Sequence, residues 1–378
     1  MKIIFAGSIG RFPVGGHAWV DLQYLHGLQD LGHQVTYLEE CGAGSWVYQW
    51  ETEQLTTELD YPTSYVRACL QGTGLEQRWI YRAGDTSVGM PLEAFLAACA
   101  DADLLIVRGS PIDLWRDEYT WPRRRAYIDS DPVFTQIRMA GGDPYLMETV
   151  ERCETLFTIG QRLGAPDCLV PSCDRYWHKM VAPISMKHWD VADDDAGHFT
   201  SVMQWQSYKD VVYQGRHFGN KNREFEKFIE LPGLTSQSFE IAMTGGHHEE
   251  LSRFGWKVRP GWKVSQTPDS YQEFVQQSRV EFAVAKHGYV VSRGGWFSDR
   301  SICYLASGRP VLVQDTGLGD WLPLGEGLLV FTELKDVLRG IELINGDYAA
   351  HRRAARALAE TYFAADRVLP RFLEQAVS

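Results

Sequence analysis

The sequence predicts an α/β protein built from two doubly wound, Rossmann-like domains. The chain has 378 residues, which exceeds one ordinary core and suits two domains of about 100–200 residues each. Short apolar strands alternate with helical patterns, which is typical of parallel sheets. This alternation runs twice, on either side of a segment with Pro, Lys, Trp and an acidic run at Asp193–Asp195. We therefore expect an N-terminal domain over residues 1–180, a linker over 181–198, a second domain over 199–360, and a C-terminal helix within 361–378 that packs back toward the N-terminal domain.

The opening residues form the first predicted strand-loop-helix unit. A strand over Lys2–Ala6 is followed by a glycine-rich loop and by a helical pattern over Trp19–Leu31, in which leucines recur every three residues. Gln34–Leu38 is the second predicted strand. Residues 41–90 are rich in Trp, Tyr, Thr and Gly without a sustained period, so we treat them as an insertion of unassigned fold that shapes an acceptor pocket.

The remaining elements continue the alternation in both domains. The N-terminal domain adds a helix over Leu92–Ala100 and strands over Asp103–Val107 (which runs into Arg108-Gly109-Ser110), Ala126–Ile128, Thr155–Ile159 and Cys168–Val170. The second domain has predicted strands over Phe199–Met203, Phe239–Met243, Val280–Ala285 and Pro310–Gln314, and helices over Lys221–Glu230, Ser270–Gln277, Ser298–Ala306 and Thr332–Leu343, before helical patterns over Arg352–Phe363 and Leu369–Val377. Ligands of such sheets bind at the carboxyl ends of the strands, so the predicted site is a central cleft that the two domains face.

Charge and cysteine usage exclude several classes of protein. The formal net charge is −12, which argues against a general binder of nucleic acid or anionic membrane, because such partners require a basic surface. Seven scattered cysteines without a zinc-ligand spacing predict reduced thiols. The N-terminus lacks the pattern of a signal peptide, and no run approaches the roughly 20 apolar residues of a membrane span. We expect a cytoplasmic protein with no integral membrane association.

Residues 287–317 are the most specific stretch of the sequence. A turn at Gly294 and Gly295 leads into a helix for which Ser298 is a good N-cap, so free backbone N–H groups point out of the helix start. Such a start accommodates a phosphate group. Arg300 lies in the first turn, where the helix dipole disfavours a cation, and its presence therefore suggests an anion nearby. The alternative is a well-capped core helix with a solvated arginine.

The pattern Ala306-x-Gly308-x-Pro310-Val311, together with the turn Asp315-Thr316-Gly317, resembles the C-terminal signature of GT-B glycosyltransferases. The resemblance implies a nucleoside diphosphate sugar as donor and no metal cofactor, because these enzymes hold the diphosphate with cations and helix dipoles. The paired glutamates of many retaining members are missing, since Gly295 and Cys303 stand in their places. Asp299 is then the expected partner of the ribose hydroxyls.

The same resemblance implies further donor-binding residues. Lys221, which follows the loop through Gly215, stands where such enzymes carry a lysine for the diphosphate; the alternative is an ordinary surface lysine. Gly245 and Gly246 end a strand, where missing side chains let a ligand approach the backbone or simply form a turn. The remaining candidates are Trp262 and Lys263 beside the nucleobase, with a buried tryptophan as the alternative, Lys286 for phosphate or sugar, and Trp296, Ser298, Arg300, Asp315, Thr316 and Gly317 in the signature stretch.

The acceptor side is predicted on the first loop of the N-terminal domain. Gly15, Gly16 and His17 follow the first strand, and inverting GT-B enzymes use a His or Asp in this region as general base. An imidazole, with an ordinary pKa of about 6.5, suits proton abstraction, which is worth about 10²–10⁴ in rate. Asp129 and Asp131 end another strand and would orient His17, act as base or bind acceptor hydroxyls. We set aside a metal at this D-x-D spacing and at His247-His248-Glu249-Glu250, which lacks the spacing of a metal site.

The sequence therefore predicts a metal-independent, inverting glycosyltransferase. Its donor is an ADP-heptose or a UDP- or GDP-hexose, and its acceptor is a hydroxyl or amine of a small molecule or glycan. A nucleotide-sugar epimerase or hydrolase on the same frame is one alternative. A non-catalytic two-lobed binding protein is the other, and it would need neither a diphosphate site nor a base.

Overall fold

The computed structural model describes residues 1–44, 46–52, 54–109, 112–191 and 197–378, which form two compact units. Unit 1 comprises Met1–Ile159, Ser172–Ser185 and Ala365–Ser378, and unit 2 comprises Gly160–Pro171 and Met186–Ala364. These boundaries differ from a simple division near residue 180, because Gly160–Pro171 packs with the C-terminal unit before the chain returns to the first. The predicted strand-end residue Ser110 and the acidic run Asp193–Asp195 lie outside the described residues.

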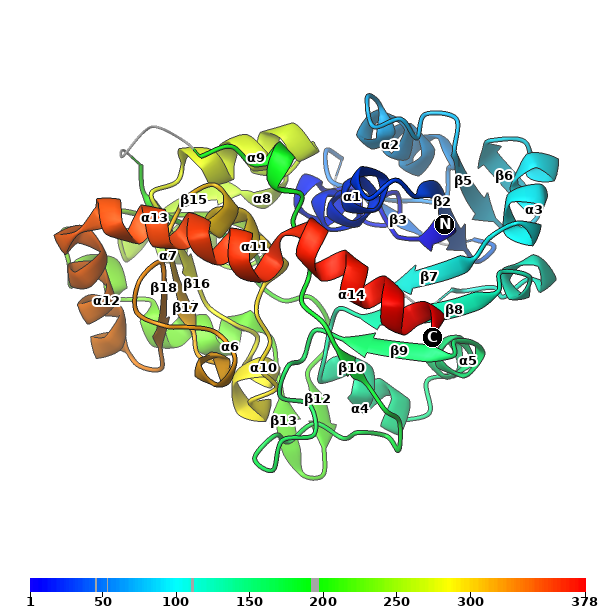
Figure 1. Cartoon of the computed structure of the whole chain (residues 1–378). Helices are drawn as coiled ribbons and strands as arrows, with labels where there is room; N and C mark the ends of the chain where they lie inside the picture. The colour runs from blue at the N-terminus through cyan, green and yellow to red at the C-terminus, as the bar shows by residue number, and fades with distance from the viewer. Residues whose placement is uncertain (45, 53, 110–111, 192–196) are drawn as a thin grey trace. The chain divides into compact units, whose positions relative to one another are not determined.

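Unit 1 is built on an eight-stranded sheet with the strand order β10-β9-β8-β7-β1-β2-β5-β6 (Figure 1). Its strands are β1 (Lys2–Ala6), β2 (Gln34–Cys41), β5 (Trp79–Ala83), β6 (Thr86–Gly89), β7 (Leu104–Arg108), β8 (Arg124–Asp129), β9 (Thr155–Thr158) and β10 (His178–Lys179). All pairings are parallel except that of β5 with β6. The central strand β1 is apolar on both faces and buried from Ile3 onward, as expected for a strand that helices cover on both sides.

The helices of unit 1 are α1 (Gly15–Asp30), α2 (Asp60–Leu70), α3 (Leu92–Ala100), α4 (Phe134–Ala140), α5 (Pro144–Arg152) and α14 (Ala365–Val377). The last helix, red in Figure 1, packs on α1 at a point where α1 has no side chain. A Cβ at Gly27 would lie 2.6 Å from Cδ1 of Leu369, so glycine permits this close approach.

Three sequence predictions for unit 1 change in the structure. Residues 41–90, left unassigned above, form the hairpin of β3 (Val47–Gln49) and β4 (Gln54–Thr56), then α2, β5 and β6. The predicted strand at Cys168–Val170 is wrong, and β10 occupies the sheet edge instead. The predicted loop Gly15-Gly16-His17 is instead the first turn of α1, which begins at Gly15.

Unit 2 contains a six-stranded, entirely parallel sheet with the order β15-β14-β11-β16-β17-β18. Its strands are β11 (Phe199–Gln204), β14 (Phe239–Thr244), β15 (Lys257–Pro260), β16 (Val280–Ala283), β17 (Val311–Gln314) and β18 (Leu328–Phe331), and a separate hairpin joins β12 (Val211–Tyr213) to β13 (Arg216–Phe218). Aromatic side chains from the strands fill the core, with Phe282 stacked on Phe331 and Trp256 packed beside Phe239.

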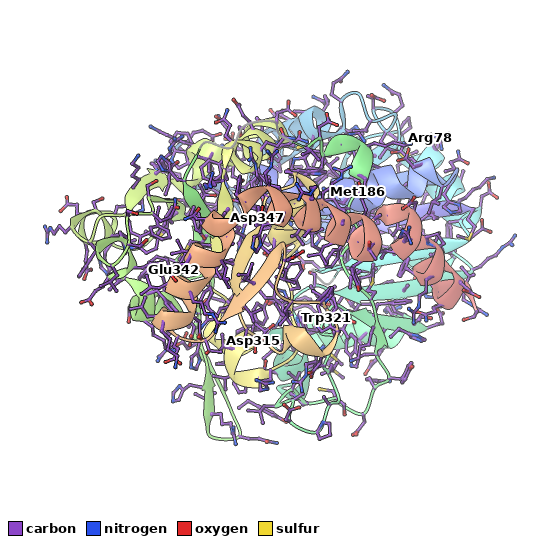
Figure 2. The ribbon with its side chains drawn as sticks, turned by 60° about the vertical axis from the view of Figure 1, so that its left-hand side comes forward. Arg78, Met186, Asp315, Trp321, Glu342 and Asp347 are labelled. Atoms are coloured by element: carbon purple, nitrogen blue, oxygen red, sulfur yellow. The ribbon has the colours of Figure 1, made fainter. Side chains whose placement is uncertain are left out.

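The helices of unit 2 are α6 (Lys221–Phe225), α7 (His248–Arg253), α8 (Gly261–Val264), α9 (Pro268–Gln277), α10 (His287–Ser292), α11 (Asp299–Ala306), α12 (Leu334–Gly346) and α13 (Tyr348–Leu358), with a π turn over Ala359–Phe363. Asp347, labelled in Figure 2, caps α13 by accepting the Ala350 N–H at 3.0 Å. In the described part of the chain, no helix combines the length and apolar character that a membrane span requires.

Candidate functional site

A group of three cations gathers at the carboxyl ends of the unit 2 strands. Lys221 begins α6, Lys286 follows β16, and Arg300 lies in the first turn of α11. The half-buried Lys221 ammonium forms no hydrogen bond or ion pair with any described residue. Its burial and the nearby charges of Arg300 and Lys286 hold the pKa of Lys221 well below its ordinary value. The charges of Glu281 and Asp299 oppose this shift, but Lys221 has no ion-pair partner among the described residues.

Arg300 differs from Lys221 because it has a protein anion. Its guanidinium pairs with Glu281 on β16 and donates to the Val202 carbonyl oxygen at 2.9 Å. Its side chain is only 12% exposed, so the alternative of a solvated arginine is wrong, and the anion inferred from its position is Glu281 in this structure. The fully buried Glu281 leaves its second oxygen, Oε2, without a hydrogen-bond partner among the described residues.

A small pocket lies at the start of α11. Its polar wall is formed by Ser298, Arg300, Ser301 and Gln314, and Trp296 and Phe297 line it beside them. Ser298 occupies the N-cap position, but its side chain makes no capping hydrogen bond. The fully buried Ser301 hydroxyl also has no partner among the described residues. The Arg300 guanidinium, the unpaired Ser301 hydroxyl and the start of α11 together suit an anionic oxygen ligand.

Lys286 is held between aromatic rings. Its Nζ donates to the Tyr208 hydroxyl at 2.6 Å and lies 4.4 Å from the centroid of the Tyr208 ring and 5.3 Å from that of Tyr289. Tyr289 in turn stacks on Trp296 at 4.2 Å. The predicted candidates Lys286 and Trp296 therefore belong to one contiguous group of side chains.

Arg162 is a residue that the sequence prediction missed. It belongs to unit 2, in the segment Gly160–Pro171, and lies against two glycines with positive φ. A Cβ at Gly295 would come within 2.8 Å of the Arg162 side chain, and a Cβ at Gly317 within 2.6 Å. Its guanidinium pairs with Asp167 and Asp320 and donates to the Arg293 carbonyl oxygen at 2.7 Å. Arg162 thus links the loop before α11 to the loop after β17.

The predicted turn Asp315-Thr316-Gly317 is stabilised by hydrogen bonds within unit 2. Asp315 Oδ1 accepts the Gly317 N–H at 2.8 Å and the Leu318 N–H at 3.0 Å, and Thr316 Oγ1 donates to the Trp296 carbonyl oxygen at 2.6 Å. Asp315 and Trp321 mark the two ends of this loop in Figure 2. The close approach at Gly317 is made by Arg162. These residues therefore shape the loop through contacts within unit 2.

Other predicted donor contacts lie in separate local settings. Gly215 forms the turn of the β12–β13 hairpin at a φ of 74°. Gly245 and Gly246 follow β14, and a Cβ at Gly246 would lie 2.8 Å from the Trp205 ring. Trp262 lies in α8, with the Lys263 ammonium 5.6 Å from its ring centroid. Asp299 accepts the Arg300 N–H at 3.0 Å.

Unit 1 has its own buried polar group at the carboxyl ends of β1 and β7. His17 Nε2 lies 2.8 Å from Ser8 Oγ, and Arg108 Nη2 donates to the same oxygen at 3.3 Å. Arg108 also forms a buried ion pair with Asp21, which accepts the Ser8 N–H at 2.9 Å. Phe12 packs its ring edge against the His17 imidazole at 4.9 Å. The helix start at Gly15 and Gly16 brings His17 into this group.

Asp129 is not a partner of His17. The fully buried carboxylate accepts from Gln136 and Thr158 at 2.8 Å each and from the Asp131 N–H at 3.0 Å, and burial raises its pKa. The prediction that Asp129 orients His17 is therefore wrong. Ser8, which the sequence prediction left out, contacts His17 at 2.8 Å, and only its place in the loop after the first strand could have pointed to it.

Within the described residues, no group of three or more His, Cys, Asp or Glu side chains is placed to hold a metal ion. His248 lies with Nε2 3.1 Å from the Gly245 carbonyl oxygen, within its own turn. All seven cysteines are free thiols, and five of them are buried.

Comparison with known proteins shows the fold. No described protein family and no curated protein matches the sequence. Among solved structures, an alpha-glucosyltransferase in complex with UDP is similar over 100% of this chain and 99% of its own, with a TM-score of 0.59 and 10% identity. The Anabaena protein HepE in complex with UDP and glucose is similar over 100% of both chains, with a TM-score of 0.58 and 12% identity. Sucrose-phosphate synthase from Thermosynechococcus elongatus is similar over 99% of this chain and 98% of its own chain, with a TM-score of 0.55 and 12% identity.

The predicted GT-B architecture is therefore confirmed, since glycosyltransferases of this class share the fold over the whole chain. At 10–12% sequence identity, the similarity to these structures shows the fold of the chain. One of the neighbours was solved with UDP and a 13-mer DNA.

Proposed function

We propose that this protein is a glycosyltransferase that moves a sugar from a nucleoside diphosphate donor to a hydroxyl or amine of a small molecule or glycan. The observation that carries the proposal is the unneutralised Lys221 ammonium beside Arg300 and Lys286. A half-buried cation without an anionic partner is unfavourable in the free protein. A diphosphate would relieve that cost and would complete the cluster.

The pocket at the start of α11 supports the same assignment. A phosphate oxygen there would meet the α11 N–H groups, the Arg300 guanidinium and the unpaired Ser301 hydroxyl. In the transfer step the bond between the anomeric carbon and the diphosphate breaks, and negative charge grows on the leaving phosphate. Donors already in place for that charge lower the barrier more than donors that must reorganise. No metal is required for this stabilisation.

Uridine is the base we propose first, ahead of the GDP-hexose and ADP-heptose alternatives. Its support is that the fold neighbours include an alpha-glucosyltransferase and HepE, each in complex with UDP. The side chain that we propose for stacking on the base is Trp262. For the stereochemistry we propose inversion, with His17 of unit 1 as the proton acceptor.

The proposed acceptor is not DNA, although one neighbour was solved with it. The net charge of −12 opposes binding to a polyanion, because each phosphate contact needs a cation from the protein. A neutral or cationic acceptor has no such requirement. The seven free thiols fit a reducing compartment such as the cytoplasm, which is the location we propose.

The test is a panel of UDP-, GDP- and ADP-sugars, each incubated with the protein and a set of small hydroxyl and amine acceptors. Acceptor-dependent release of UDP, with a glycosylated product of inverted configuration by NMR, is the expected result. Release without any acceptor would indicate a hydrolase, and binding without release would indicate a non-catalytic protein. Thermal stabilisation by none of the free nucleoside diphosphates would overturn the proposal.

A further inference from the structure

Three buried polar side chains of unit 2 lie around the cation cluster without belonging to it. Asn220 and Glu224 are each 1% exposed, and Gln314 is 4% exposed. Asn220 directly precedes Lys221, and Glu224 follows it by three residues on α6. A buried polar group costs free energy unless it has hydrogen-bond partners. The partners of these three side chains therefore show how the segment around Lys221 is held.

Gln314 links α6 to the end of β16. Its Oε1 accepts the Ala285 N–H at 3.1 Å, and its Nε2 donates to Glu224 Oε2. The orientation of the amide is fixed, because a backbone N–H can only donate and so requires the amide oxygen. Ala285 directly precedes Lys286, and Glu224 lies on the helix that Lys221 begins. Gln314 thus connects the segments that carry the two lysines.

Asn220 makes a second connection between the same two segments. Its Nδ2 donates to the Tyr208 carbonyl oxygen at 2.6 Å, and its Oδ1 accepts the Ser207 N–H at 3.0 Å. The hydroxyl of Tyr208 in turn accepts from the Lys286 ammonium at 2.6 Å. The backbone adds a further bond, because the His287 N–H donates to the Asn220 carbonyl oxygen at 3.2 Å. The connections through Gln314 and through Asn220 close a ring that contains both lysines.

We propose that Gln314 and Glu224 are positioning residues that fix the distance between the ammonium groups of the two lysines, so that one donor diphosphate contacts both. This inference rests on the proposed glycosyl transfer. The charge of Lys286 lowers the pKa of Lys221, so the two cations repel each other and need to be held in place. Both polar groups of the Gln314 amide have protein partners, so this residue acts on the ligand through the lysines.

A fixed pair of cations should discriminate between nucleotides. A diphosphate carries its charge on two linked groups and can meet both ammonium groups at once, whereas a monophosphate can meet them only one at a time. The separation of the two lysines therefore matters for UDP and much less for UMP. Loss of the overall fold would instead weaken both nucleotides alike.

Calorimetry of UDP and UMP binding by the full-length protein tests the proposal. Gln314→Met removes both hydrogen bonds at similar volume, and we expect it to bind UDP about 3–30-fold more weakly and UMP with nearly wild-type affinity. Thr200→Val is the matched control. The buried Thr200 hydroxyl lies 2.7 Å from the hydroxyl oxygens of Ser278 and Tyr304, near the amino end of β11. Its loss should change neither affinity.

An exchange of the two side chains separates positioning from packing. Gln314→Glu alone sets a second carboxylate against Glu224 and should weaken UDP binding. When Glu224→Gln is added, the carboxylate at position 314 accepts both the Ala285 N–H and the amide at position 224, so the link returns with donor and acceptor reversed. Lys227, which pairs with Glu224, is 56% exposed and loses little. The double variant should recover most of the UDP affinity that Gln314→Glu loses.

Three results would overturn the positioning role. They are wild-type UDP affinity in Gln314→Met, equal losses for UDP and UMP, and a double variant that binds UDP no better than Gln314→Glu. Failure of the proposed function looks different, since a wild type that binds no nucleoside diphosphate would remove the donor site and this inference with it.

Discussion

The two units differ in how they hold their cations. In unit 1 the buried arginines have protein anions, because Arg108 pairs with Asp21 and Arg82 pairs with Glu40 and Glu118. In unit 2, Arg300 pairs with Glu281, and Arg162 pairs with Asp167 and Asp320, but Lys221 forms no ion pair with a described residue. The buried carboxyls of unit 1, Glu39 and Asp129, are held by hydrogen bonds, whereas unit 2 has a cation that an anionic ligand would pair with.

This difference indicates what each unit is built to bind. A site whose charges are paired within the protein needs no charged ligand. A site with an unpaired cation lowers the stability of the free protein and raises its affinity for an anion. The following predictions test the difference between the two units, beginning with the largest expected effect.

Breaking the ion pair of unit 1 should cost the most. Asp21→Asn leaves the fully buried Arg108 without an anion, and we expect the free energy of unfolding to fall by about 3–5 kcal/mol. Chemical denaturation measures the change. Asp101→Asn is the control, because it removes an exposed ion pair with Lys2 and should cost no more than about 1 kcal/mol. Equal losses in the two variants would show that unit 1 does not depend on its paired charges.

Glu39 should make the stability of the protein pH-dependent. Burial raises the pKa of this carboxyl to about 7, against an ordinary value near 4.5. The folded state therefore binds a proton that the unfolded state has lost between these values, and stability must fall as the pH rises from about 4.5 to 7. The full contribution is about 3 kcal/mol. Urea unfolding at pH 5, 6, 7 and 8 should show a flatter curve for Glu39→Gln than for the wild type; parallel curves would contradict the assignment.

Removing the unpaired cation of unit 2 should have opposite effects on stability and on binding. The lowered pKa of Lys221 shows that folding disfavours its charged form, so Lys221→Met should unfold at a higher temperature than the wild type in the absence of ligand. It should bind UDP about 10–100-fold more weakly, because a charge-assisted contact contributes about 1.5–3 kcal/mol. Arg300→Ala is a poorer probe, since it also leaves the buried Glu281 unpaired. A less stable variant with unchanged UDP affinity would contradict this account.

Arg162→Ala should have the smallest effect. Its carboxylate partners, Asp167 and Asp320, are 51% and 60% exposed, so solvent screens both ion pairs, and we expect a loss of about 1 kcal/mol. The loops that it joins flank the α11 pocket, so the KM for the donor should rise severalfold while kcat changes little. Lys335→Ala removes an exposed pair of the same unit and should change neither quantity. A loss confined to kcat would contradict a positioning role.

The sequence predicted most strands and the α11 site because local signals are strong there. Buried parallel strands are apolar on both faces, and the run from Gly294 to Val311 combines a turn, a cap and a strand within a few residues. The errors arose where a residue depends on distant partners. Arg162 contacts loops that lie more than 120 residues further along the chain, as its bond to the Arg293 carbonyl shows. Gly15 and Gly16 begin a helix although paired glycines are typical of loops.

The same limit explains the acceptor side. His17 was selected by its position after the first strand, but its partners were not, because Arg108 reaches Ser8 from a strand 100 residues away. Asp129 was assigned to His17 because both follow strands of one sheet. The structure shows instead that the Asp129 carboxylate accepts hydrogen bonds from the side chains of Gln136 and Thr158.

Titration calorimetry of UDP binding at several pH values, in buffers of different ionisation enthalpy, tests the central claim most directly. If unit 2 keeps an unneutralised Lys221 for a diphosphate, the wild type should bind UDP and take up protons as the bound phosphates raise the lysine pKa. Lys221→Met should bind more weakly and without that uptake. A wild type that does not bind UDP, or a variant with the same affinity and the same proton uptake, would contradict the claim.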